Sequence, residues 1–268
     1  MANSINTNAG ALIALQNLNN TSRDLSITQN RVNTGQKVSS AKDNGAIFAI
    51  ATNQRAEMGA LDAVKQSMQR GQSIVDVALA AGETITKALE EQKSLAVAIE
   101  SSVANSDAEK AYLADFNALG AEITKALAGA NFDGVNLFSA AAADVEVKTG
   151  TAAADKFVLK ATGIATAVAT SGSANTRATA TAAAVDTALK GFTAELGALG
   201  TKSKSLERSL SFTSKMQDAI EVGVGNLVDA DLAKESARLT ALQTKQQLGV
   251  QALSIANQSS SVLLGLFR

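Results

Sequence analysis

Residues able to carry out chemistry are scarce in this chain, and their spacing does not assemble a site. Asp229 and Asp231 could hold a metal, but two residues apart on a helix they point to different faces, which favours solvated carboxylates near a helix start. Gly223-Val224-Gly225 is a lone G-x-G in a helical stretch with no strand before it, so it does not predict a nucleotide-binding loop. No catalytic residue, metal site or cofactor is predicted.

The composition excludes further classes of function. Histidine and cysteine are absent, which removes the commonest general base, the thiol nucleophile and nearly every transition-metal site. Lys and Arg total 24 against 25 for Asp and Glu, so neither nucleic acid nor a membrane surface is an expected partner. No apolar run is long enough for a membrane span, and no cleaved secretory signal is recognisable. Composition alone predicts a cytoplasmic protein.

The elements that organise the chain are long helices, and proline is absent. A heptad seam of a and d positions holds over six repeats from Leu61 to Val103. Its members are Leu61, Val64, Met68, Gly71, Val75, Ala78, Gly82, Ile85, Leu89, Gln92, Ala96, Ile99 and Val103. The small members should let a partner helix approach closely. A single helix cannot bury its own apolar seam, so the rest of the chain is expected to supply helices that cover it.

Two covering helices are predicted. Ser106 with Glu109 forms a capping box that starts the first, and Gly129 ends it. The second runs along Val185 to Leu210, and Gly223 and Gly225 are expected to loosen its end.

Between these helices the sequence pattern is no longer helical. Alternation at Val145 and Val147, and again at Phe157 and Leu159, predicts one or two short hairpins. The Ala/Thr/Ser tract from Ala161 to Ala184 is expected to be exposed.

The two ends of the chain are predicted to be amphipathic helices whose apolar stripes have no partner nearby in sequence. The first occupies Met1 to Val32 and stops at Thr34-Gly35. The next helix, which leads into the heptad seam, could then be capped by Ser39, Ser40 or Asp43. The last helix carries regularly spaced leucines at Leu232, Leu239, Leu242 and Leu253.

With both ends considered together, the chain resembles a bacterial flagellin. The motifs that carry the resemblance are Ile5-Asn6-Thr7-Asn8, Arg31-Val32-Asn33-Thr34-Gly35, Ser40-Ala41-Lys42-Asp43-Asn44, Asn131-Phe132-Asp133-Gly134, Leu196-Gly197-Ala198, Asn226-Leu227-Val228-Asp229-Ala230-Asp231 and Ala256-Asn257-Gln258. Asn44 stands where the family has a second aspartate, and Ser259-Ser260-Ser261 replaces the usual proline.

The resemblance implies a mainly α fold, in which long antiparallel helices form a coiled-coil bundle with a small β-hairpin insertion. Residues 1–43 and 229–268 would be terminal coiled-coil helices of a filament's inner core. Residues 44–140 and 184–228 would form the long-helix core domain, and 141–183 a small outer insertion. The inner-core assembly residues would be Leu12, Leu18, Leu25, Leu239, Leu242 and Leu253.

The resemblance also implies a function, namely a structural subunit that polymerises into the flagellar filament for swimming. Implied partners are the chain itself, paralogous flagellins, an export chaperone, the secretion apparatus, and hook-associated and cap proteins. Secretion to the cell exterior then replaces the cytoplasmic expectation. One alternative is a hook-filament junction protein with similar termini. The other, a filament subunit carrying an enzyme in its insertion, is disfavoured because the insertion lacks His and Cys.

A further stretch resembles the part of flagellins that the Toll-like receptor for flagellin recognises. Receptor-detected members carry Gln-Arg-x-Arg-Glu-Leu-Ala-Val on the long helix. The corresponding residues are Glu90-Glu91-Gln92-Lys93-Ser94-Leu95-Ala96-Val97. Leu95 matches, but Glu91 replaces the first arginine, so weak recognition is expected.

Overall fold

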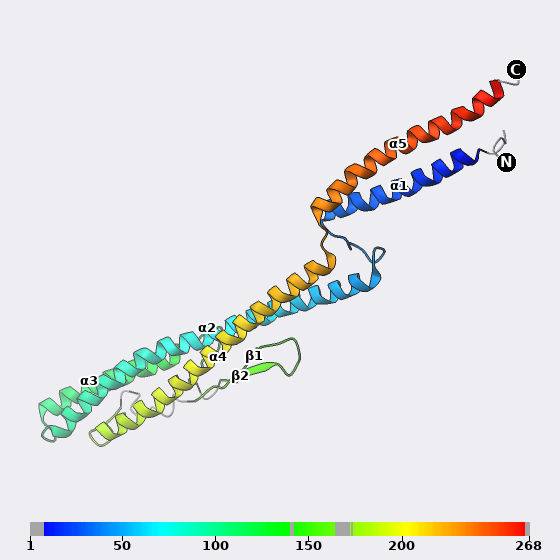
Figure 1. Ribbon diagram of the computed structural model, residues 1–268. Helices are drawn as coiled ribbons and strands as arrows, with labels where there is room; N and C mark the ends of the chain where they lie inside the picture. Colours follow the sequence, from blue (N-terminus) through cyan, green and yellow to red (C-terminus); the bar gives the residue numbers. More distant parts are fainter. Residues whose placement is uncertain (1–7, 140–141, 164–171, 173, 266–268) are drawn as a thin grey trace. The chain divides into compact units, whose positions relative to one another are not determined.

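The computed structural model describes residues 8–139, 142–163, 172 and 174–265. These residues form long helices and one hairpin (Figure 1). The elements are α1 (Ala9–Thr34), α2 (Gly45–Ser101), α3 (Asp107–Gly129), β1 (Val145–Lys148), β2 (Lys156–Leu159), α4 (Ala182–Val228) and α5 (Leu232–Gly265). None of the helices in the described part is long and apolar enough to cross a membrane. The predicted mainly α class with a small hairpin is confirmed.

The chain forms two compact units, to which α2 and α4 each contribute a part. The terminal unit comprises residues 1–56 and 219–268, and the central unit comprises residues 57–218. The central unit holds the larger apolar core, whose bulkiest buried side chains include Phe116, Phe138 and Phe192.

The heptad seam of α2 forms this core as predicted. Every seam member from Leu61 to Ile99 is buried. Val103 is the exception, with 77% of its surface exposed, because α2 ends at Ser101 and the chain turns before the last repeat is complete. The period of the apolar residues therefore predicted the buried face, while the turn decided where that face stops.

The glycines in the seam admit two different neighbours. A Cβ at Gly82 would overlap the side chain of Leu196, so α4 approaches closely at this point, as expected. At Gly71 the neighbour is Val147 of β1, which a Cβ would meet at 2.5 Å. The hairpin thus covers part of the seam that was expected to face a helix.

A charged cluster also joins α2 to α4. The ammonium of Lys93 lies 2.7 Å from Asp186, which also pairs with Lys190 at 2.6 Å. Hydrogen bonds from Lys190 and then Lys93 lower the pKa of Asp186 to about 2. Because this folded-state pKa lies below the ordinary value, the stabilising effect is present above about pH 4 and is lost as the pH falls through about 2.

The insertion packs against the central unit more closely than expected. The single hairpin pairs Val145 with Leu159 in antiparallel register, and the side chains of Val147 and Leu159 are buried. In the Ala/Thr tract Ala174, Thr176, Ala178 and Thr179 are exposed as expected, but Ala180 is buried, so the tract is not exposed throughout. Residues 164–171 and 173 of that tract lie outside the described residues.

Arg177, from the end of this tract, ties the insertion to the turn between α2 and α3. The predicted capping box is present in part: Ser106 accepts the N–H of Glu109, but the Glu109 carboxylate accepts the N–H of Asn105, at 2.6 Å, and not that of Ser106. The guanidinium of Arg177 lies 3.1 Å from that carboxylate and donates to the carbonyl oxygens of Glu100 and Ser102. One side chain therefore neutralises a nearly buried carboxylate and satisfies carbonyl groups at the end of α2.

Replacing Arg177 with alanine is expected to lower the free energy of unfolding of the central unit by about 2–3 kcal/mol. The change leaves the Glu109 carboxylate, whose side chain is 9% exposed, without its cation. Urea denaturation followed by circular dichroism measures the loss. Arg70→Ala is the matched control, because the Arg70–Asp133 pair is more than half exposed and should contribute at most about 1 kcal/mol. Equal losses in the two variants would contradict this role of Arg177.

The residues that end one helix and start the next were predicted in part. Gly35 ends α1 with a positive φ of 70°, as expected. The restart is capped by Asn44, whose side chain accepts the N–H groups of Ala46 and Ile47. The expected caps Ser39, Ser40 and Asp43 instead bond to one another. Their hydrogen bonds to Asp43, first from the backbone of Ser40, lower the pKa of this carboxyl.

In the terminal unit the end of α4 meets the segment after α1. The helix runs unbroken through Gly223 and Gly225 to Val228, so the expected loosening is wrong. Lys37 donates its N–H to Val228 at 2.7 Å, and Ala230 donates to Gly35 at 2.9 Å. This short backbone ladder holds the two chain segments together beside α1 and α5.

Candidate functional site

The residues first considered for chemistry have structural roles. Asp231 is the cap of α5, because its side chain accepts the N–H groups of Ala233 and Lys234, each at 3.1 Å. Asp229 donates its N–H to the carbonyl oxygen of Gly225, which extends the helical hydrogen bonding of α4 by one residue. Among the described residues no group of three or more Asp and Glu side chains is placed to hold a metal ion.

The surface that stands out is the antiparallel pair of α1 and α5 in the terminal unit. Three contacts set its register: Asn8 donates to the Ala256 carbonyl at 2.6 Å, Gln246 lies 3.4 Å from Ser22, and Arg31 pairs with Glu235 at 3.1 Å. In this register the first and last helices of the chain run side by side along most of their length (Figure 1). The stripes that lacked a partner nearby in sequence therefore meet each other.

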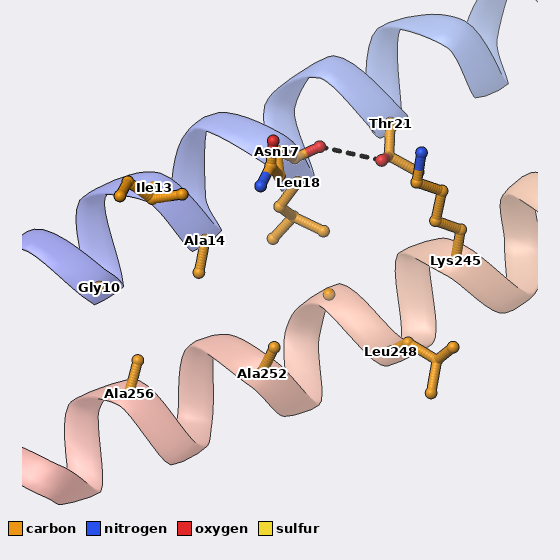
Figure 2. A pocket seen from close by; sticks show the side chains of 11 residues that line it. Gly10, Ile13, Ala14, Asn17, Leu18, Thr21, Lys245, Leu248, Ala252 and Ala256 are labelled. Carbon is orange, nitrogen blue, oxygen red and sulfur yellow. Dashed lines mark hydrogen bonds between the residues drawn. The ribbon is translucent and has the colours of Figure 1, made fainter.

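Small residues allow this pair to pack closely. Leu18 lies against Gly249, where an added Cβ would come within 3.2 Å of its side chain. Figure 2 shows Leu18 and Ala14 pointing toward α5, and Ala252 and Ala256 pointing toward α1. The groove that remains between the helices has a volume of about 420 Å³. A pair so thinly filled buries little apolar surface on its own.

The six expected assembly leucines occupy different depths in this pair. Leu25 and Leu242 are buried. Leu18, Leu239 and Leu253 are half-buried. Leu12 is 62% exposed and lies outside the seam between the two helices.

The outer faces of the pair carry large apolar side chains as well. Of the fourteen exposed large hydrophobic residues in the described chain, ten belong to the terminal unit. On α5, Leu248 and Ile255 are 59% and 69% exposed, and Figure 2 shows Leu248 pointing away from α1. The expectation that α5 has a single apolar stripe is therefore wrong, because Leu248 and Ile255 place large apolar side chains outside that stripe. A helix with apolar side chains on two faces requires covering on both of them.

Two family models match this chain and account for both ends. The bacterial flagellin N-terminal helical region matches residues 5–143, and the bacterial flagellin C-terminal helical region matches residues 182–267. The chain belongs to the bacterial flagellin family. Flagellin is a structural protein, and this member is a subunit that polymerises into the helical filament of the bacterial flagellum, the extracellular organelle of swimming motility.

Full-length relatives agree with this assignment. Flagellins FljM and FljK of Caulobacter vibrioides are each 51% identical to the chain, over 280 and 271 residues that cover 99% of both partners. A flagellin of Brucella melitensis is 39% identical over 282 residues, again covering 99% of each chain. These relatives give no support to the alternative of a hook-filament junction protein.

The stretch that resembles the receptor-recognition site of flagellins lies on α2, beside α3. Glu91 is exposed, and Leu95 is half-buried against the central core. Both line a groove of about 480 Å³ whose other walls come from Ser94, Asp115, Ala118 and Leu119.

Sequence reasoning missed the outward-facing residues of α5. Leu248, Val250 and Ile255 do not belong to the heptad columns that drew attention to Leu239 and Leu253. A count of the apolar residues of α5 that lie outside its heptad columns would have revealed them.

Proposed function

We propose that neighbouring copies of this flagellin pack their α1–α5 pairs together to form the inner layer of the filament. The observation that carries the proposal is the set of large apolar side chains exposed on both helices, including Leu12, Leu248 and Ile255. Each such side chain contributes about 1.5–3 kcal/mol when it is fully covered. In the isolated chain these side chains stay in contact with water. In the polymer each subunit covers them and gains this free energy.

The contact proposed is of the open, head-to-tail kind. In the proposed arrangement the face of α5 that carries Leu248 meets the face of α1 that carries Leu12 on the next copy. Contacts between two different surfaces generate helical filaments when the rotation does not close. In this arrangement residues 1–43 and 229–268 form the inner core. Residues 44–140 and 184–228 form the layer around it, and 141–183 lies outermost.

The finer functional assignments belong to the same proposal. The subunit is secreted through the flagellar export apparatus with the help of a chaperone, and it meets cap and hook-associated proteins at the ends of the filament. It co-assembles with paralogous flagellins. Support for this last point is that FljM and FljK, two relatives of similar closeness, come from one organism. The subunit performs no catalysis.

Replacing Leu248 with aspartate is expected to abolish filament growth while leaving the isolated chain folded. In the monomer this side chain is largely in water, so a carboxylate costs little there. In the proposed inner layer the same carboxylate would be buried without a partner, at a cost of several kcal/mol per subunit. Circular dichroism checks the monomer, and seeded growth viewed by electron microscopy checks the filament.

Val103→Asp is the matched control, since Val103 is also exposed but lies in the central unit. This variant should polymerise as the unmodified chain does. Normal filaments from the Leu248→Asp variant would refute the inner-layer arrangement.

A further inference from the structure

A single aromatic side chain projects from the central unit on α4. Phe212 is 66% exposed, although the chain has only eight phenylalanines and fully buries three of them, Phe116, Phe138 and Phe192. One turn to either side on the same face lie Arg208 and Lys215, both exposed. Neither cation takes part in an ion pair among the described residues. The result is an apolar knob between two positive charges.

The groove between α2 and α3 has the complementary character. Leu95, Ala118 and Leu119 provide apolar walls, and Glu91 and Asp115 are exposed carboxylates on its rim. A second hollow of about 310 Å³ adjoins it through Glu91 and Leu119 and adds the carboxylate of Glu122 and the ammonium of Lys87. This surface offers apolar contact beside three carboxylates and one ammonium group, a net negative charge.

One copy of the chain cannot bring the knob and the groove together. The helices α2 and α4 are antiparallel, since Leu196 packs at Gly82 and Gln217 bonds to Asp62. At about 1.5 Å per residue, Phe212 and Leu95 lie about 40 Å apart along these helices. A second copy displaced along the helix axes by about this distance would bring its Phe212 to the same height as the groove.

We propose that Phe212 of one subunit inserts into the groove between α2 and α3 of a neighbouring subunit. Arg208 and Lys215 then lie against Glu91 and Asp115, which orients the aromatic ring and opposes the reverse arrangement. The contact is heterologous, because knob and groove are different surfaces, and it is therefore suited to an open polymer. This inference rests on the proposed function, in which the chain polymerises, and adds to the proposed inner layer a specific contact outside the terminal helices.

Cysteine pairs test the contact directly, because the chain has no cysteine of its own. Phe212→Cys and Ala118→Cys proteins are mixed, grown from seeds of unmodified filament, and oxidised with diamide. Covalent dimers are expected on a non-reducing gel, and a ladder of higher oligomers is expected when both substitutions are in one chain. An internal bridge cannot explain the ladder, because a disulfide requires Cα atoms within about 7 Å.

The control is the pair Phe212→Cys and Val103→Cys, which combines two exposed positions that the contact does not join. Filaments in which the Ala118→Cys pair yields no more dimer than this control would overturn the contact and leave the inner-layer proposal intact. Failure of the unmodified protein to polymerise would overturn both.

An independent measurement uses the concentration needed for growth. Phe212→Ala should raise the critical concentration about tenfold or more, as loss of an interface anchor does. Arg208→Glu with Lys215→Glu should also raise it, and Glu91→Lys with Asp115→Lys in the partner should restore growth. Unchanged critical concentrations in all these proteins would also overturn the contact.

Discussion

The Leu242→Asp variant is expected to form no filaments and to lose the pairing of α1 with α5. Leu242 is 8% exposed, and in the register of the two helices it lies opposite Leu25, which is also buried. A carboxylate there would lie against the apolar side chain of Leu25 and be desolvated, at a cost of about 3–5 kcal/mol. The pair buries little else, because small residues and a groove occupy much of its remaining length. This single change therefore removes a large share of what holds the helices together.

Hydrogen exchange and electron microscopy measure the two consequences separately. Amides of residues 9–34 and 232–258 should exchange faster in the variant than in the unmodified chain, while those of α3 should not change. Leu242→Met is the control, because it keeps the apolar volume and should cost less than about 1.5 kcal/mol. Filaments of normal length and yield from Leu242→Asp would show that this seam is not needed for assembly.

Signalling through the Toll-like receptor for flagellin is expected to be weak or absent for the monomer, and partly restored by Glu91→Arg. Glu91 is exposed on α2 at the rim of the groove beside α3, so a receptor binding this stretch would meet its carboxylate. Glu91 stands where receptor-detected flagellins have an arginine. The carboxylate lacks the hydrogen-bond donors of that arginine and carries the opposite charge. We expect this to cost about 2–5 kcal/mol of binding, which corresponds to about thirtyfold or more in affinity.

A reporter-cell titration with purified monomer checks this prediction. Glu90→Arg is the matched control, because it changes the net charge equally at the neighbouring exposed position, where those flagellins have no arginine. Signalling by the unmodified monomer at the level of an arginine-bearing flagellin would refute the prediction. Equal recovery in both variants would show that net charge, and not the position of the arginine, controls recognition.

The sequence alone was sufficient for the elements whose stability is local or periodic. The buried seam of α2 from Leu61 to Ile99 follows from a heptad period, since side chains seven residues apart share a helix face whatever covers it. The stop at Gly35 and the N-terminal cap at Ser106 follow from residues that satisfy backbone groups within a few positions. The terminal motifs likewise sufficed to indicate the family.

The tertiary structure decided which surfaces cover that seam and which stay open. Gly71 faces Val147 of the hairpin and Gly82 faces Leu196 of α4, although both glycines occupy equivalent kinds of heptad position. Arg177 reaches the end of α2 from 75 residues away in sequence, a contact that no local pattern encodes. Only the packed chain shows that Leu248, Ile255 and Phe212 remain exposed, because exposure depends on what fails to cover a side chain. Local patterns specify helices and their buried faces, whereas the surfaces available to a second subunit are what remains after every long-range contact has been made.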